Sequence, residues 1–380
     1  MPGHRRVLFC TLGAEPGPVG GAERQAMLQA RELVKRGYAV EIVCPRAHGT
    51  RTHCVDGVLV RRLPSVDRRP FRTLTYLPVL FVWLLRYLRS YDLVHVHLAN
   101  LQVDVVGLTS RLVGVPMYAK LAAGGPRGEI SRLRALAWLT RYVGIRSAHR
   151  LQAISAEIEA DLIGLEIPRY RIVRIPNGLA ADTYYPPTPA ERAALRRHLG
   201  LPVDEVLVLF AGRFARYKGI LDLIEAWRGL DHRREASLIL VGEAAADAPV
   251  GDLPVAPRMI VRPWASNVVD YLRACDVFVL PSYAEGMSNA LLEAMGCGMA
   301  VIATRVGAAP EMIDDGRTGH LIDAGEVDDL RSALGALVID ENVRAQLGAA
   351  AAKQVAARYA IGPVVDRIIE AYESMLMEVD

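Results

Sequence analysis

The chain has 380 residues, more than one ordinary hydrophobic core holds, so we expect two domains. With 52% hydrophobic and 23% charged residues, its composition is typical of a globular protein and excludes a disordered chain. The formal net charge is only +3, but residues 1–180 carry 26 Lys and Arg against 13 Asp and Glu, whereas the remainder carries 19 against 29. The balance of +13 in the first half favours an anionic partner there. Because no stacking motif accompanies the basic residues, a nucleic-acid partner is disfavoured.

The cysteines and the start of the chain indicate the compartment. The five cysteines are an odd number, widely spaced and without a C-x-x-C pair, so we interpret them as free thiols in a reducing cytosol. Residues 1–13 are basic and then briefly apolar, but a turn follows instead of a small-residue cleavage site, so we expect no signal peptide. The most apolar run, residues 73–85, contains Pro78 and is too short to span a bilayer. We therefore expect a cytoplasmic protein, which its basic half could bring to the inner face of the membrane.

Short β-rich runs alternate with helical periods along the chain, which predicts parallel βαβ units. A proline-rich stretch at 176–190 is typical of a hinge, and the alternation restarts after it. We therefore expect an α/β protein with two Rossmann-like domains in tandem. Strands are expected at 7–10, 38–44, 93–98 and 116–121, and again at 206–211, 238–241, 277–280 and 299–304. Helices are expected at 22–36, 220–230 and 364–377, the last with Ile368, Ile369, Tyr372, Met375 and Leu376 on one face.

In doubly wound sheets ligands bind at the carboxyl ends of the strands, where helix N-termini offer free N–H groups, and four loops fit that position. In the first, residues 15–24, Gly20 and Gly21 let a ligand approach the backbone closely. This loop lacks the G-x-G-x-x-G fingerprint, and the second strand ends without an acidic residue, so a dinucleotide is disfavoured. A flexible glycine turn explains the same loop equally well.

The second loop, residues 211–220, has the chemistry of a diphosphate site. Arg213 and Lys218 flank it, and Gly212 and Gly219 free its backbone. Two cations beside a helix N-terminus suit a diphosphate through charge-assisted hydrogen bonds, although the Walker A pattern is absent. A solvated basic turn is the alternative interpretation of this loop. Because the chain has 41 arginines and only four lysines, a lysine at this position favours the functional interpretation.

The third loop, residues 282–289, ends in Ser288 and Asn289, either of which suits the N-cap of the helix that follows. Glu293 lies in this helix, where a carboxylate complements the helix dipole. Glu285 lies in the loop itself, where it could accept hydrogen bonds from hydroxyl groups. The fourth loop, residues 305–312, has a proline that suits a first helical turn.

These motifs resemble a known family. Residues 205–325 are similar to the nucleotide-binding half of glycosyltransferase family 4, retaining enzymes of the GT-B fold, in a strand followed by G-R-x-x-x-x-K-G, in E-G-x-x-N-x-x-L-E-A-M and in V-I-A-T-x-V-G-x-x-P-E. The motif G-G-A-E near the N-terminus and P-N-G at 176–178 extend the resemblance over most of the chain. It implies two Rossmann-like domains facing across a cleft. Residues 1–178 would bind the acceptor, residues 179–360 would bind a nucleotide sugar, and residues 361–380 would cross back onto the first domain.

The resemblance also implies roles for single residues. Arg213 and Lys218 would hold the donor diphosphate, Glu285 would lie near the donor sugar, and Glu293 would bind the ribose hydroxyls. It implies a UDP- or GDP-linked donor and no cofactor, and the absence of a D-x-D pair agrees with the metal independence of the family. Front-face transfer with retention would then leave the charge of the departing diphosphate on the two cations. Further donor contacts are implied at Gly21, Gly212, Gly286, Met287, Ser288 and Asn289.

The sequence departs from the family pattern after the strand at 116–121. Many members have a histidine there, and alignment by strand position puts Ala122 in its place. Gly124 and Gly125 could offer backbone donors instead. Lys120 is either a functional residue of the acceptor side or a strand-end lysine that reaches solvent.

His95 and His97 alternate on one face of the strand at 93–98, a spacing compatible with a metal pair. No third ligand is evident, and histidines of the core or of a cleft edge are the more common case. His97 is the better candidate for the acceptor side, because it lies nearer the carboxyl end of its strand.

The acceptor is less visible in the sequence than the donor. Residues 68–89 and 132–150 mix arginines with large apolar residues. Helices that lie on anionic membranes have this composition. Helices that pack in a core and have a solvated outer face explain the composition of both segments equally well. Our hypothesis is an acceptor that is lipid-linked or anionic, as in bacterial polysaccharide or glycolipid assembly. A sugar-nucleotide epimerase of related fold and a non-catalytic nucleotide-sugar-binding protein are the alternatives. Arg262, Pro263 and Trp264 lie where a base would sit.

Overall fold

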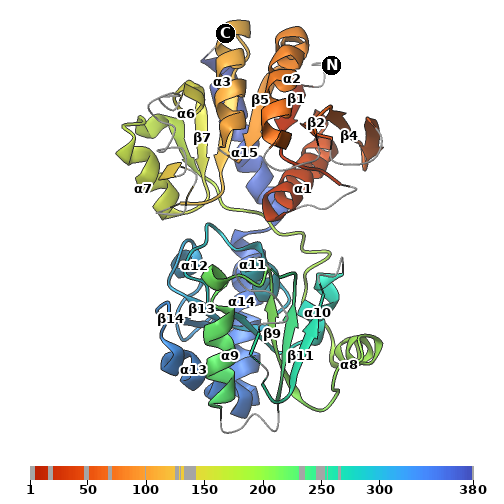
Figure 1. Ribbon diagram of the computed structural model, residues 1–380, viewed down its shortest axis with the longest axis vertical. Coiled ribbons are helices and arrows are strands. Elements are labelled where there is room, and N and C mark those ends of the chain that lie inside the picture. Colours follow the sequence, from red (N-terminus) through yellow and green to blue (C-terminus); the bar gives the residue numbers. More distant parts are fainter. Residues whose placement is uncertain are drawn as a thin grey trace. The chain divides into compact units, whose positions relative to one another are not determined.

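The chain divides into two compact units, each an α/β domain with its own sheet (Figure 1). The N-terminal unit comprises residues 1–178 and 361–380, and the C-terminal unit comprises residues 179–360. The computed structural model describes residues 5–15, 20–46, 51–66, 71–98, 100–124, 128, 130–131, 143–230, 236–244, 253–254, 256–263 and 267–378.

The N-terminal unit is built on an eight-stranded sheet in the order β3-β4-β2-β1-β5-β6-β7-β8. All neighbouring pairs are parallel except β3 and β4, which form a hairpin. Asp56 and Gly57 turn this hairpin with φ angles of 49° and 81°, as a two-residue Asp-Gly turn requires. The strands are β1 (Arg6–Cys10), β2 (Ala39–Pro45), β3 (Thr52–Val55), β4 (Val58–Leu63), β5 (Leu93–His97), β6 (Met117–Leu121), β7 (Arg150–Ala153) and β8 (Ile172–Arg174).

The final helix of the chain belongs to the N-terminal unit, as the family resemblance implied. Helix α15 (Ile361–Met377) packs against α1 (Gly21–Lys35) (Figure 1). The buried apolar side chains of α15 join the core on that face of the sheet. Polar contacts fix the same seam, since Arg36 Nε lies 2.8 Å from Asp366 Oδ1 and Tyr38 donates to Glu373 at 3.1 Å. The other helices that the structure describes in this unit are α2 (Phe71–Tyr87), η1 (Leu88–Ser90), α3 (Leu101–Val113), α6 (Val143–Ser147), α7 (Ala156–Gly164) and η3 (Arg169–Arg171).

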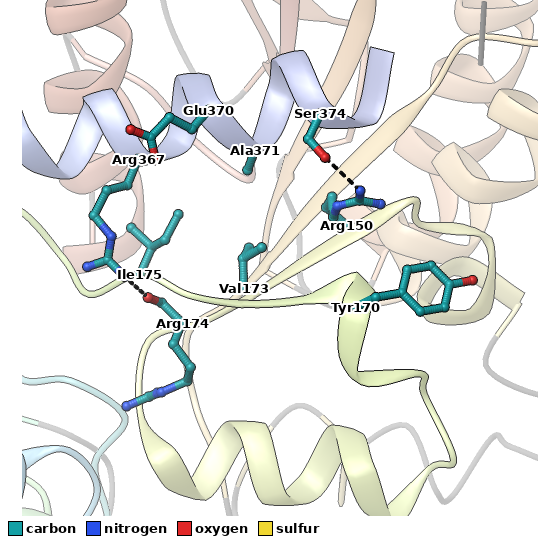
Figure 2. Close-up of a pocket in the computed structure, with 9 residues that line it drawn as sticks. All are labelled: Arg150, Tyr170, Val173, Arg174, Ile175, Arg367, Glu370, Ala371 and Ser374. Atoms are coloured by element: carbon teal, nitrogen blue, oxygen red, sulfur yellow. Dashed lines mark hydrogen bonds between the residues drawn. The ribbon is translucent and has the colours of Figure 1, made fainter. Parts of the chain in front are cut away.

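A cavity of about 380 Å³ lies between α15 and the edge strand β8, and Figure 2 shows three arginines among the side chains that line it. Their guanidinium groups already have partners. Arg150 pairs with Glu378, Arg174 Nε lies 3.4 Å from Glu159 Oε2, and Arg367 donates to the carbonyl of Arg174. The cavity is therefore part of the seam that docks the final helix on the sheet edge, and we do not regard it as a ligand site.

The C-terminal unit has a six-stranded sheet in the order β11-β10-β9-β12-β13-β14, with every pair parallel. Among its described residues the largest fully buried side chain is Trp227, which packs in the core and donates from Nε1 to the carbonyl of Pro257 at 2.9 Å. The strands are β9 (Val206–Ala211), β10 (Ala236–Val241), β11 (Met259–Arg262), β12 (Val277–Leu280), β13 (Ala300–Thr304) and β14 (His320–Ile322). The helices are α8 (Pro189–His198), η4 (Arg216–Lys218), α9 (Ile220–Arg228), α10 (Val268–Ala274), α11 (Asn289–Gly296), α12 (Ala309–Met312), α13 (Val327–Ile339) and α14 (Glu341–Arg358).

The predicted architecture of two Rossmann-like sheets is confirmed, and two of its strands, β9 and β12, begin and end at the predicted residues. The ends of the other predicted strands shift by one or two residues. Six strands of the structure were not predicted from the sequence: β3, β4, β7, β8, β11 and β14. All but β4 of these have only three or four residues, too few for a periodic pattern to be distinguished from a loop.

Candidate functional site

Three loops of the C-terminal unit lie together at one edge of its sheet. Because all six strands are parallel and β9, β12 and β13 are neighbours, their carboxyl ends share that edge. Backbone hydrogen bonds join the loops that follow. The amide of Tyr283 donates to the carbonyl of Tyr217 at 2.8 Å, and the amide of Ala308 donates to the carbonyl of Gly286 at 2.8 Å. The second, third and fourth candidate loops thus form one surface.

Close packing of these loops depends on glycines. Gly219 has a φ of 66°, and a Cβ atom there would lie 1.9 Å from the carbonyl oxygen of Pro281. Gly307 has a φ of 55°, and its Cβ would lie 2.3 Å from the carbonyl oxygen of Gly286. Both positions therefore need glycine for backbone conformation and for space. They bring the loops after β9 and β13 against the loop after β12.

Lys218 and Glu285 meet at this surface. Lys218 ends η4, and its Nζ lies 2.6 Å from Oε1 of Glu285 in the loop after β12. The buried Ser282 donates a hydrogen bond to the same carboxylate oxygen at 2.7 Å, and Thr304 at the end of β13 donates to the carbonyl of Ser282 at 2.5 Å. Both charged side chains are mostly buried. Oε1 of Glu285 thus contacts both the ammonium group of Lys218 and the hydroxyl of Ser282, which restrains the position of the ammonium group.

Arg213 stands apart from this pair. It follows β9, its side chain is exposed, and within the part of the chain that the structure describes no carboxylate lies within ion-pair distance of it. Its guanidinium can therefore bind an anion without first leaving a protein partner. A cation without an ion pair, in the same loop as an immobilised one, suits a ligand with two phosphate groups.

The start of α11 completes the surface. Of the two candidates that the sequence offered, Ser288 is the N-cap, and its hydroxyl accepts from the amide of Leu291 at 3.3 Å. Met287 and Asn289 flank this cap, and Glu293 is buried one turn farther along the helix. All the predicted donor residues of the C-terminal unit thus lie in the loops after β9 and β12 or in α11. Ser282 and Thr304, which order the loops, were missed, because a serine or threonine near a strand end carries no signal of its partner.

The predicted residues of the N-terminal unit lie at the carboxyl ends of β1, β5 and β6. Gly21 opens α1, and Lys120 is buried in β6 opposite His97 of β5. Gly124 packs on α7, since a Cβ there would come within 3.0 Å of Ile158 Cγ1. Gly125 and Trp264 lie outside the described residues, as do residues 16–19 of the first loop.

His95 and His97 lie in the core. Their rings stack with centroids 4.1 Å apart, Phe9 packs against both, and Nδ1 of His95 lies 2.5 Å from the hydroxyl of Tyr372 on α15. Burial lowers the pKa of both imidazoles well below the usual range, so both are neutral, and the nearby Lys120 acts in the same direction. Among the described residues no group of three His, Cys, Asp or Glu is placed to hold a metal ion. Of the two sequence interpretations, the core histidine is the one that this packing supports.

Comparisons with known proteins agree with this arrangement. The model of a glycosyl transferase 4-like domain matches residues 20–178, and the model of glycosyl transferases group 1 matches residues 205–340. The D-inositol 3-phosphate glycosyltransferase of Arthrobacter sp. (strain FB24) is 30% identical over 92% of this chain and 90% of its own length. The chain therefore belongs to the family of the two matching models, the group 1 glycosyl transferases with a glycosyl transferase 4-like domain.

Other members and solved structures are similar over the whole chain. The D-inositol 3-phosphate glycosyltransferase of Xylanimonas cellulosilytica is 29% identical over 98% of both chains. HepE of Anabaena, solved with UDP and glucose, has a TM-score of 0.80 and 21% identity over 98% of this glycosyltransferase and all of the HepE chain. At that identity the likeness shows the GT-B fold alone.

Proposed function

We propose that this glycosyltransferase moves a hexose from a nucleotide sugar to an acceptor hydroxyl, with retention of configuration and without a metal ion. The observation that carries the proposal is the contact between Lys218 and Glu285, together with Arg213 of the same loop as Lys218, which has no ion pair with a described carboxylate. It provides a cationic surface at the strand ends where a doubly wound sheet binds nucleotides. HepE, which shares the fold, was solved with UDP, and this supports a UDP-linked donor in preference to a GDP-linked one.

In the proposed reaction the bond between the anomeric carbon and the diphosphate oxygen breaks, and its electron pair leaves with the diphosphate. The acceptor oxygen bonds to the same face of the anomeric carbon, and its proton passes to the departing phosphate oxygen. Arg213 and Lys218 stabilise the negative charge that develops there. An ammonium group has three donors, so Lys218 can contact a phosphate oxygen while it stays hydrogen-bonded to Glu285. Preorganised contacts of this type each contribute about 3–4 kcal/mol to transition-state stabilisation.

The acceptor in this proposal carries an anionic group. The +13 balance of residues 1–180 and the phosphate in the name of the acceptor of the curated relatives both support it. Two sources fit the same chemistry, a water-soluble inositol phosphate and a phosphate-linked lipid intermediate of polysaccharide or glycolipid assembly. In the second case the enzyme would work at the membrane surface, on the cytoplasmic side where nucleotide sugars are made.

The decisive experiment compares Lys218→Ala with Lys353→Ala, a matched control on the exposed face of α14. With UDP- and GDP-sugars offered together with myo-inositol phosphates or polyprenyl-phosphate sugars, we expect Lys218→Ala to lose about 10²–10³-fold in kcat and the control to keep the parent rate. Turnover of Lys218→Ala within a factor of two of the parent would refute the proposed role of the cation.

Product analysis separates the alternatives. A new nucleotide sugar formed without acceptor would indicate an epimerase, and donor binding with neither transfer nor hydrolysis would indicate a binding protein. The anomeric proton coupling of the product tests retention. Loss of activity in excess EDTA would contradict metal independence.

A further inference from the structure

Helix α2 carries large apolar side chains on its outer face. Phe71, Leu74 and Val82 are 56%, 65% and 65% exposed, and Pro78 and Leu85 are exposed between and after them. Their spacing of three and four residues places all five on one side of the helix, and we call them the apolar stripe. The opposite side, with Tyr76, Leu80 and Leu84, is buried in the unit. The helix is therefore apolar on the face that the fold does not cover.

The exposed apolar surface continues on the neighbouring helix. α2 packs beside α3 (Figure 1). On α3, Leu108 and Leu112 are exposed one turn apart, and Leu112 is 60% exposed. Of the fifteen large apolar side chains that stand exposed among the described residues, seven lie on these two helices. Single exposed apolar residues are ordinary, but a concentration of this kind marks an interaction surface.

The charges around the stripe have one sign. Between residues 71 and 90 there are three arginines and no acidic residue. Arg86 and Arg89 are exposed at the end of the stripe, Arg111 is exposed on α3, and none of the three forms an ion pair with a described carboxylate. An apolar face rimmed by arginines that have no ion pair with a described carboxylate matches the interface of an anionic bilayer, where apolar side chains enter the acyl boundary and arginines contact lipid phosphates. None of the described helices has the length and apolar character needed to cross a membrane, so the helix would lie on the surface.

The apolar stripe begins beside the carboxyl ends of the strands of the N-terminal unit, where the proposed acceptor would bind. In the first turn of α2, Arg72 donates to the carbonyl of Leu12 at 3.2 Å, and Leu12 lies in the loop after β1. The first residues of the stripe, Phe71 and Leu74, are therefore anchored beside the carboxyl ends of the strands of the N-terminal unit. We propose that the apolar stripe, Leu108, Leu112 and the surrounding arginines dock this unit on an anionic lipid surface. The sugar-accepting end of a lipid-linked substrate would then arrive at that edge, a step that rests on the proposed function.

Flotation with lipid vesicles tests the docking without donor or acceptor. We expect the protein to float with vesicles that contain phosphatidylglycerol at low salt, and to stay in solution with pure phosphatidylcholine or at high salt. The double variant Leu74→Glu/Val82→Glu should reduce the bound fraction at least ten-fold. Ile339→Glu, the matched control at the end of α13, replaces a side chain that is 59% exposed and should bind as the parent does. A second double variant, Leu108→Gln/Leu112→Gln, tests the surface independently, and thermal unfolding should show that all three remain folded.

The proposal would be overturned if the parent, the stripe variant Leu74→Glu/Val82→Glu and the variant Leu108→Gln/Leu112→Gln bound vesicles equally. It would also be overturned if the parent bound no vesicle. The parent could instead form a dimer in sedimentation that the stripe variant does not form, and bind no vesicle. That result would identify a second copy of the chain as the occupant of the surface and would also overturn the proposal. Transfer to a water-soluble acceptor should be unchanged in the stripe variant. Failure of docking and failure of the proposed catalytic function are therefore seen in separate assays.

Discussion

Replacement of Gly219 by alanine tests how closely the donor loops must pack. Gly219 joins η4 to α9 in a left-handed conformation, with a φ of 66°, and a Cβ atom there would lie 1.9 Å from the carbonyl oxygen of Pro281. Real Cβ contacts essentially never fall below 3.0 Å, so the two loops must separate by about 1 Å. These loops carry Lys218 and Glu285, so the displacement falls directly on the pair.

The magnitude follows from a comparison with Gly200. That glycine has nearly the same φ, 62°, but nothing within 4 Å of the position of its Cβ. Gly200→Ala therefore costs only the left-handed strain, about 1 kcal/mol, or roughly 2–4 °C in Tm for a domain of this size. Gly219→Ala adds overpacking of about 1–3 kcal/mol to the same strain. A misplacement of about 1 Å at reacting groups costs about 10²-fold in rate, so we expect a loss of that order in kcat/KM for Gly219→Ala and none for Gly200→Ala.

Thermal unfolding and steady-state kinetics with a competent donor measure the two effects. The reasoning is wrong if both variants lose the same stability and Gly219→Ala retains the kcat/KM of the parent. That result would mean that the loops separate without cost and that the Lys218–Glu285 contact is not needed in its present place.

Three further predictions concern other parts of the chain. Because burial lowers the pKa of His95 and His97 well below the usual range, the unfolded chain binds protons that the native unit does not. The stability of the N-terminal unit should be full above about pH 6.5 and should fall below it, by up to about 2.7 kcal/mol per pH unit for two protons. Urea midpoints at pH 7.5 and 5.5 measure this, and equal midpoints would contradict it. Ser282→Ala removes a hydrogen bond to the Glu285 carboxylate and should lower kcat about ten-fold, so an unchanged kcat would show that the hydroxyl does not position the carboxylate. Cys54 is the one exposed cysteine of the five, and a thiol reagent should modify one thiol in the native protein and the other four only after unfolding; more than one rapid modification would contradict the burial.

The sequence by itself determined the fold class and the residue types of the proposed donor site. Strands β9 and β12 were predicted to the residue because a strand buried on both faces is a continuous apolar run that ends where polar loop residues begin. The cap at Ser288 and the glycine at 219 were visible for a similar reason, since each is a local requirement of the backbone at a helix start.

Tertiary structure decided what depends on residues far apart in the chain. Lys218 and Glu285 are separated by 67 positions, and they meet because β9 and β12 are neighbours in the sheet, which no local pattern encodes. The histidines of β5 show the same limit. Their alternation placed both on one face, but the final helix, whose Tyr372 lies 277 residues after His95, made that face a core. The surroundings of a side chain depend on which element packs over it, and that element can come from any part of the chain.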